Sequence, residues 1–259
     1  MNSMERKMVE VLTDLRQNHG VTEVKAEFES EGSRLSELMR LKDIASSCGV
    51  GLVLKIGGPE AIRDIYDAML LGVSSIVAPM VESAYALKKF IEAIEKNVRA
   101  DARGEVAFAV NIETNQAFQN FDQMLALPGI RNIARITVGR VDLSGSLGLS
   151  KDKINSEEIF AITKTICEKA KRAGLSTTIG GGISLEAITF IQRLLNEKLI
   201  DRFETRKIVF DDSVKDIAEA IRRAGRFELL WLCNKHDLYN DIAVEDKDRI
   251  RMLEMRFPL

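Results

Sequence analysis

The fold of this chain is decided by two segments, Asn111-Ile112-Glu113-Thr114 and Val138-Gly139-Arg140-Val141-Asp142-Leu143-Ser144. Each segment follows a short apolar run and becomes acidic where that run ends. A stretch with a helical pattern, from Gln116 to Leu127, lies between them. The order strand, helix, strand places the carboxylates of Glu113 and Asp142 at the same end of two neighbouring parallel strands.

These two carboxylates indicate a metal site. No histidine or cysteine accompanies them, so the ligands would be oxygen atoms, which suit a hard divalent cation such as Mg²⁺ or Mn²⁺. In a β/α barrel the carboxyl ends of the strands form the catalytic face. The alternative is that Glu113 and Asp142 are structural carboxylates that cap helices.

Strand-like and helical segments alternate along the chain, which predicts βαβ units and a parallel sheet. The length of 259 residues fits one TIM-type (β/α)8 barrel, and no linker divides the chain, so we predict a single α/β barrel domain over residues 1–259. The predicted strands are Val21–Glu29, Gly51–Gly57, Ser74–Met80, Val106–Glu113, Asn132–Arg140, Ser176–Gly180 and Phe203–Asp211. The predicted helices are Met4–Leu15, Leu35–Cys48, Ala61–Leu71, Ala84–Asn97, Gln116–Leu127, Glu157–Ala173, Leu185–Asn196 and Val214–Ala224.

One strand of the barrel is missing from this series and could be degenerate. It is either Glu228–Cys233, or an N-terminal strand that the opening helix has replaced. The charged tail, residues 237–259, is predicted to form a C-terminal helical arm. Within the tail Ile250, Leu253 and Phe257 recur at spacings of three and four residues, which is typical of an apolar helical stripe.

The composition of the chain indicates which kinds of binding partner to expect. The 37 basic and 39 acidic residues nearly balance and form no basic stripe, so we expect no nucleic-acid partner. No apolar run approaches the roughly 20 residues of a membrane span, and no signal-like segment opens the chain, so we expect no membrane partner. Cys48, Cys167 and Cys233 are odd in number and widely spaced, which argues against disulfides and favours the cytoplasm.

Period-2 alternation predicts which side chains enter the barrel. In the first strand Glu23, Lys25, Glu27 and Glu29 share one face, opposite the apolar residues that would meet the helices. Lys55 shares a face with Val53 and Gly57, and Asn111 shares a face with Glu113. Ionisable groups inside a barrel are costly unless they are paired or bound to metal, so they indicate a site.

The chain resembles the HpcH/HpaI aldolase and citrate lyase β-subunit family over roughly residues 21–149. The resemblance rests on four motifs in the family's order. They are Lys55 with Ile56-Gly57-Gly58, then Ser75-Ile76-Val77-Ala78-Pro79-Met80-Val81-Glu82-Ser83-Ala84, then Ile112-Glu113-Thr114, and Gly139-Arg140-Val141-Asp142-Leu143-Ser144 with Ser146-Leu147-Gly148. The ordered set is more specific than any one motif.

By this resemblance Glu113 and Asp142 would bind a divalent metal, Mg²⁺ foremost, with Mn²⁺ or Co²⁺ as alternatives. The substrate would be a pyruvate-like 2-oxo acid or a related carboxylate. Cleavage of a carbon–carbon bond would leave an enolate, which a nearby cation stabilises. The resemblance also implies a homo-oligomer, a trimer or hexamer, with the C-terminal arm at the interface. The alternative is an arm that folds back over its own barrel and closes the bottom.

Two departures from the family matter. Lys55 stands where the family has an arginine, so charge is kept but bidentate recognition is lost. The early strand of pyruvate aldolases ends in a Glu-His pair, whereas this chain reads Glu27-Phe28-Glu29-Ser30-Glu31. Without a histidine, proton transfer would fall to Glu29, Glu27, Lys55 or a metal-bound water, and Glu29 and Lys55 are the candidate catalytic residues. Lys55 is also the candidate substrate-binding cation. The alternative for Lys55 is an ion pair with Glu27 or Glu29.

The remaining candidates would contact substrate. Gly181 and Gly182 belong to a glycine turn at a predicted helix start, where N–H groups can hold an anion; a tight turn that merely needs glycine is the alternative. Glu82 could bind substrate or cap the next helix. Arg140 could contact substrate or pair with Asp142.

Three functions remain open from the sequence. The first is a metal-dependent lyase or aldolase that works through an enolate. The second, suggested by the acidic early segment, is a citrate-lyase-type enzyme acting on an acyl-CoA or acyl thioester. The third is a non-catalytic binding barrel, which the missing histidine and the replaced arginine would allow.

Overall fold

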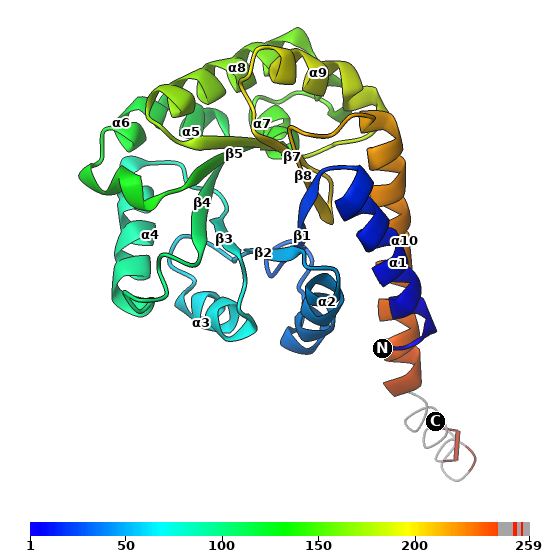
Figure 1. The fold of residues 1–259 in the computed structure, drawn as a ribbon. Helices are drawn as coiled ribbons and strands as arrows, with labels where there is room; N and C mark the ends of the chain where they lie inside the picture. Colours follow the sequence, from blue (N-terminus) through cyan, green and yellow to red (C-terminus); the bar gives the residue numbers. More distant parts are fainter. Residues whose placement is uncertain (243–250, 253–254, 256–259) are drawn as a thin grey trace.

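The computed structural model describes residues 1–242, 251, 252 and 255. Within them eight strands close into a barrel with helices around its outside (Figure 1), so the predicted TIM-type fold is confirmed. The strands are β1 (Val21–Glu27), β2 (Gly51–Lys55), β3 (Ser75–Ala78), β4 (Ala107–Ile112), β5 (Arg135–Gly139), β6 (Ser176–Gly180), β7 (Arg202–Glu204) and β8 (Ile208–Asp211).

Helices precede, separate and follow the strands. The longer ones are α1 (Ser3–Asn18), α2 (Leu35–Ser47), α3 (Ile62–Leu71), α4 (Ala84–Asn97), α8 (Glu157–Arg172), α9 (Ile188–Asn196) and α10 (Ile217–Ile242). The short ones are α5 (Asn115–Gln119), α6 (Phe121–Leu125) and α7 (Arg140–Ser146), with 3-10 turns η1 (Pro128–Asn132), η2 (Lys151–Lys153) and η3 (Leu185–Ala187). The helix predicted over Gln116–Leu127 is thus wrong, because it is divided between α5 and α6 at Asn120.

The eighth strand runs in the opposite direction to the others. Neighbouring strands from β1 to β7 pair in parallel, whereas β8 is antiparallel both to β7 and to β1. The single strand predicted over Phe203–Asp211 is therefore wrong, because that segment is a hairpin. Its turn is closed by the Thr205 N–H, which donates to the Ile208 carbonyl (2.9 Å), and by the Ile208 N–H, which donates to Thr205 Oγ1 (3.1 Å).

The reversal has two consequences for the predictions. The turn at Thr205-Arg206-Lys207 lies at the end of the barrel where the parallel strands finish, which is the catalytic face. The segment Glu228–Cys233, considered as an eighth strand, lies instead inside helix α10. The residues of the predicted apolar stripe, Ile250, Leu253 and Phe257, fall outside the described part of the chain.

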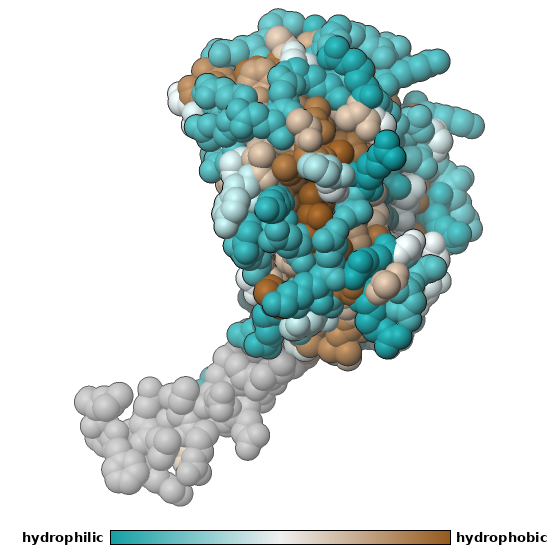
Figure 2. Space-filling view, turned by 90° about the vertical axis from the view of Figure 1, so that its left-hand side faces the viewer, coloured by the Kyte–Doolittle hydropathy of each residue, from teal (hydrophilic) through white to brown (hydrophobic). Residues whose placement is uncertain are grey.

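Apolar side chains form two separate clusters. The larger cluster fills the layer between the strands and the helices and contains the outward-facing strand residues such as Leu54, Val110 and Phe210. A small cluster inside the barrel consists of Val53, Val77, Ala109 and Val209. The rest of the lumen is polar, as the alternation of strand residues predicts. Polar side chains cover most of the outer face drawn in Figure 2, because amphipathic helices turn their apolar sides inward.

Helices α1 and α10 lie side by side along one flank of the barrel (Figure 1). They are antiparallel: Asn2 contacts Asn234 near one end (2.7 Å), and Asp14 contacts Arg223 near the other. Phe227 and Trp231 of α10 are buried against the barrel. No helix among the described residues is both long and apolar enough to cross a membrane.

Candidate active site

The ends of several strands surround a cavity of about 720 Å³ at the catalytic face. Six of the predicted site residues line it: Glu29, Lys55, Glu113, Asp142, Gly181 and Gly182. Glu82 and Arg140 do not. Strands β1, β2, β4 and β5 bring the first four together although they are far apart in the sequence. The register of the strands, Asn111 beside Thr137 and Ile112 beside Val138, sets the two acidic segments at the same height.

Glu113 is held in a defined orientation. It follows β4 directly, and Thr114 then caps α5 by accepting a hydrogen bond from the Ala117 N–H (3.1 Å). The Met80 N–H donates to Glu113 Oε1 (2.9 Å), and the Asn111 side-chain amide donates to Oε2 (2.9 Å). The carboxylate occupies space left by the missing side chain of Gly139, where a Cβ would lie 2.4 Å from Glu113 Oε2.

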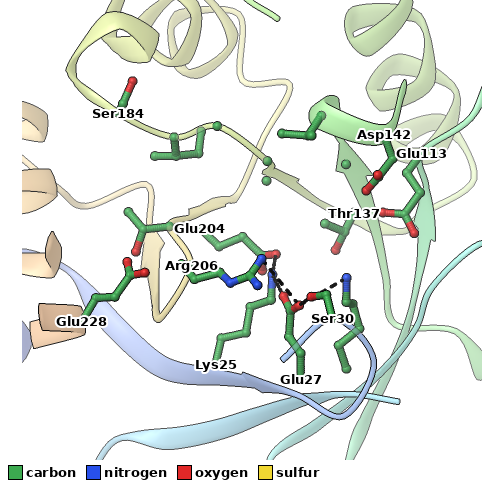
Figure 3. Close-up of a pocket in the computed structure, with 18 of the residues that line it drawn as sticks. Lys25, Glu27, Ser30, Glu113, Thr137, Asp142, Ser184, Glu204, Arg206 and Glu228 are labelled. Atoms are coloured by element: carbon green, nitrogen blue, oxygen red, sulfur yellow. Dashed lines mark hydrogen bonds and ion pairs between the residues drawn. The ribbon is translucent and has the colours of Figure 1, made fainter. Parts of the chain in front are cut away.

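Asp142 lies beside Glu113 on the same side of the cavity (Figure 3). It sits in the first turn of α7 and is exposed to the cavity. Burial raises the pKa of Glu113, and the negative charge of Asp142 raises it further; the Met80 N–H, Lys55 and Asn111 act in the opposite direction. Because the charges of Glu113 and Asp142 repel each other, an additional positive charge between these carboxylates would be favourable.

The donor set fits a divalent metal of the magnesium type. Glu113 and Asp142 offer oxygen atoms only, and Mg²⁺ is commonly bound by one or two carboxylates while water and substrate complete its shell. Across the described residues, no group of three or more histidine, cysteine, aspartate or glutamate side chains could hold a metal ion. A site built by this chain would therefore be open to substrate on most of its coordination positions.

Lys55 lines the same cavity as Glu113, but its ammonium group is already paired. Lys55 Nζ lies 2.6 Å from Glu29 Oε2 and 3.6 Å from Glu27 Oε2. Burial lowers the pKa of Lys55, yet Glu27, Glu29 and Glu113 outweigh burial and raise it, so the side chain is charged at neutral pH. The predicted alternative of an ion pair is thus present here, and it leaves Lys55 in the cavity wall.

Below Lys55 the barrel lumen contains a buried ion network. Lys25 Nζ donates to Glu204 Oε1 (2.6 Å) and lies 3.1 Å from Glu27 Oε1. Glu27 is 2 % exposed, and burial alone would raise its pKa. Lys25, Lys55 and the Ser30 hydroxyl reverse that effect and lower the pKa of Glu27 to about 2. Glu27 is therefore an ionised structural carboxylate and a poor proton carrier.

The glycine turn is packed tightly against the segment that carries Asp142. Gly181 and Gly182 have φ values of +73° and +63°, a conformation that favours glycine. A Cβ at Gly181 would lie 2.8 Å from the Val141 nitrogen and 2.9 Å from the Arg140 nitrogen. A side chain at this position would therefore displace the start of α7 as well as the turn. Binding of an anion by the N–H groups remains a prediction.

Arg140 supports the glycine turn from below. Its guanidinium is fully buried and donates to the Gly181 carbonyl (2.9 Å) and to the Asn155 side chain (2.7 Å). It also stacks over the ring of Phe190, 4.5 Å from its centre. Burial lowers its pKa to about 10. Any influence of Arg140 on substrate would pass through the turn, because its side chain does not line the cavity.

Glu82 has a similar supporting position. Its Oε1 accepts a hydrogen bond from the Thr114 hydroxyl (2.7 Å), the same hydroxyl that caps α5. Its backbone carbonyl accepts from the Asn120 side chain (2.8 Å). The cap of α4 is the neighbouring Ser83, whose Oγ accepts from the Ala86 N–H. Glu82 thus helps to fix the residue that follows Glu113, and substrate contact by Glu82 remains a prediction.

Sequence reasoning did not identify Glu204 and Arg206, which also line the cavity. Both belong to the β7–β8 hairpin, whose turn was hidden inside a presumed continuous strand. The polar triplet Thr205-Arg206-Lys207 between Phe203 and Ile208 was the available signal. Figure 3 shows Arg206 reaching from this hairpin toward Glu27.

The comparison with protein families identifies the family of the chain. The model of the HpcH/HpaI aldolase/citrate lyase family matches residues 13–180, more than half of the chain. The chain belongs to this family. Membership supports an aldolase- or lyase-type activity. No match was found among curated proteins.

Solved structures with the same fold include family members at low sequence identity. An HpcH/HpaI aldolase from Desulfitobacterium hafniense DCB-2 gives a TM-score of 0.62 at 14 % identity, covering 79 % of this chain and 82 % of that one. An HpcH/HpaI aldolase/citrate lyase family protein from Burkholderia cenocepacia J2315 gives 0.61 at 15 %, covering 92 % and 90 %. The citrate synthase SbnG gives 0.63 at 18 %, covering 91 % of each chain. At these identities the likeness establishes the fold.

Proposed function

We propose that this protein is a metal-dependent carbon–carbon lyase of the aldolase type, acting through the enolate of a pyruvate-like 2-oxo acid. The observation that supports this best is the meeting of Glu113, Asp142 and Lys55 around one cavity. Glu113 and Asp142 would hold a divalent ion, Mg²⁺ or alternatively Mn²⁺ or Co²⁺. Such an ion supplies positive charge beside the oxygen that becomes negative as the carbon–carbon bond breaks.

Lys55 would act from the other side of the substrate. Its ammonium group would donate a charge-assisted hydrogen bond to a substrate oxygen. To do so it must exchange the Glu29 carboxylate, now 2.6 Å away, for the substrate. Glu29 is exposed at the cavity edge, whereas Glu27 is buried, so this exchange requires little rearrangement of the lumen.

Replacement of Glu29 by substrate at Lys55 would also let Glu29 act as the acid or base. Once released from Lys55, its carboxylate is free at the mouth of the cavity and would accept or return a proton at the substrate carbon. Neither histidine can do this. His19 follows α1 at the opposite end of the barrel from the cavity, and His236 is exposed on α10. Neither lines the cavity.

We also infer that the working form is a homo-oligomer, a trimer or hexamer. Support comes from α10, which leaves Leu229 62 % and Leu232 51 % exposed in the single chain. Apolar side chains at this spacing on one helix favour a contact with another surface.

The proposal is tested by proton exchange into pyruvate. In D₂O with Mg²⁺ the enzyme should replace the methyl protons of pyruvate by deuterium, followed by ¹H NMR, and chelation should stop the exchange. Glu113→Gln and Asp142→Asn should abolish it and weaken Mg²⁺ binding measured by calorimetry. Glu60→Gln, which changes a surface carboxylate paired with Lys89, is the matched control. Exchange that persists in both site variants would overturn the proposal. Metal binding without any exchange would favour the non-catalytic barrel.

A further inference from the structure

Met80 has a backbone conformation that side chains other than glycine rarely adopt. Its φ is +51°, in the left-handed region, where the Cβ atom approaches the following carbonyl oxygen. Of the described residues, Lys198 is the only other non-glycine residue with positive φ, and it is exposed after α9. Such a conformation costs free energy and persists only where the surrounding structure enforces it. Met80 lies just after β3, at the catalytic face.

The left-handed turn directs the N–H group of Met80 at Glu113. This N–H donates to Glu113 Oε1 (2.9 Å) and so joins the β3–α4 connection to the end of β4. Pro79, which precedes Met80, has no N–H group. Met80 therefore supplies the first N–H group after β3. Because the residues that follow are fixed, the direction of this N–H group depends on φ at Met80.

The neighbours on both sides of Met80 hold its backbone in place. Ala78 before it belongs to β3, which is paired with β4. Val81 after it is completely buried, and Glu82 Oε1 accepts a hydrogen bond from the Thr114 hydroxyl (2.7 Å). The side chain of Met80, in contrast, is 42 % exposed and does not line the cavity. The part of Met80 that acts on the site is therefore its backbone.

Glu113 requires a fixed orientation to serve as a ligand. It is buried, and Figure 3 shows its carboxylate beside that of Asp142. Each of its oxygens accepts one hydrogen bond, Oε1 from Met80 and Oε2 from the Asn111 side chain. A carboxylate oxygen has two lone pairs, so each oxygen keeps one for a cation. Loss of the bond from Met80 would leave Oε1 buried without a donor and free the carboxylate to rotate.

We propose that Met80 is a positioning residue of the metal site, whose left-handed backbone directs one N–H group that orients Glu113 for the cation. This rests on the proposed function, in which Glu113 and Asp142 hold a divalent ion. Position 80 then requires a residue that tolerates positive φ, whatever the polarity of its side chain. Glycine and asparagine tolerate positive φ, whereas the β-branched valine does not. A role of the side chain would favour the apolar valine over asparagine.

The test measures Mg²⁺ affinity by calorimetry. Met80→Gly and Met80→Asn should retain most of the wild-type affinity, whereas Met80→Val should lose about tenfold or more, as expected for one charge-assisted hydrogen bond. Lys198→Val is the matched control, because it introduces the same backbone strain away from the cavity. It should lower the free energy of unfolding, as Met80→Val does, and leave Mg²⁺ affinity unchanged. Wild-type affinity in Met80→Val, or an equal loss in Met80→Asn and Met80→Val, would overturn the proposal.

A second measurement needs no metal and applies even if Met80→Val does not fold. In protein labelled with ¹⁵N-methionine, the Met80 amide signal is assigned by its absence in Met80→Asn. In Glu113→Ala this signal should move upfield and its proton should exchange faster with D₂O, because the acceptor is lost. Glu60→Gln, at the surface, should leave it unchanged. An unchanged signal in Glu113→Ala would overturn the role of Met80. If the wild type binds no Mg²⁺, the proposed function fails separately, and this signal alone decides whether Met80 orients Glu113.

Discussion

At the scale of single residues, Lys55 shows how one side chain can be both an ion-pair partner and a ligand. Its partners Glu27 and Glu29 differ in exposure, and only Glu29 can leave without unpairing a buried charge. The proposed exchange of Glu29 for a substrate oxygen therefore leaves the Glu27 contact in place. Activity should depend on the positive charge of Lys55 more than on its shape.

Replacement of Lys55 tests this. Lys55→Ala removes a charge-assisted hydrogen bond worth roughly 1.5–3 kcal/mol, so kcat/KM for pyruvate proton exchange should fall at least about tenfold. Lys55→Arg keeps the charge and should retain most of the activity. Equal kcat/KM in wild type and Lys55→Ala would reduce Lys55 to a structural ion pair.

Glu27 should contribute to stability in a pH-dependent way. Its pKa is lowered from 4.5 to about 2, so the folded state binds a proton less readily than the unfolded state. This is worth roughly 3 kcal/mol at neutral pH. The stabilisation is fully present above about pH 4.5 and is lost as the pH falls toward 2.

Glu27→Gln should therefore lower the free energy of unfolding strongly at pH 7 and much less at pH 3, measured by urea denaturation. Glu29→Gln is the control, because Glu29 is exposed and its ion pair should contribute less than about 1 kcal/mol. A loss of stability that is the same at both pH values would show that Glu27 acts through packing instead of charge.

At the scale of elements, the end of β5 shapes the metal site through a missing side chain. A Cβ at Gly139 would collide with the Glu113 carboxylate at 2.4 Å, whereas one at Gly145 in α7 would meet nothing within 4 Å. Gly139→Ala should therefore weaken Mg²⁺ binding at least about tenfold by displacing a ligand. Gly145→Ala should leave it unchanged. Equal Mg²⁺ affinity in both variants would mean that Glu113 does not bind the metal.

Strand β1 could be predicted from the sequence, whereas the β7–β8 hairpin could not. Alternation across the seven residues of β1 correctly placed Glu23, Lys25 and Glu27 in the lumen, because side-chain period is a local property. The chain reverses at Thr205–Lys207, and this segment contains no Gly, Asn or Pro, the residues that usually indicate a turn in a sequence. Besides the hydrogen bonds between Thr205 and Ile208, it is held by contacts to residues distant in sequence, such as Lys207 with Glu31, which no local pattern contains.

The candidate site also contains residues that local patterns predict and residues that they do not. Glu113, Asp142, Lys55 and Glu29 could be brought together from strand ends alone, since parallel strands finish at one face. The burial of Arg140 could not be predicted in this way, because the partners of its side chain come from the end of β6 and from Asn155. Those contacts depend on the pairing of Gly139 with Gly180, which only the folded sheet reveals.

At the scale of the whole molecule, α10 continues past the barrel toward the tail and keeps Leu229 and Leu232 exposed. Truncation after Tyr239 removes the sequence that carries Ile250, Leu253 and Phe257. We expect it to lower the molar mass found by light scattering, because an oligomer contact would be lost. Circular dichroism should show the barrel still folded. Unchanged mass, or a monomeric full-length protein at micromolar concentration, would contradict the proposed assembly.

The antiparallel pair of α1 and α10 also determines when the chain can finish folding. Met8, Leu12 and Leu15 of α1 are completely buried, yet α10, whose Arg223 contacts Asp14 of α1, is more than 200 positions away in the sequence. On the ribosome, the packing of α1 must therefore wait until α10 has emerged. Closing so long a loop is slow, and until then α1 exposes apolar surface. A nascent chain halted before Ile217 should therefore bind chaperones until synthesis resumes and α10 docks.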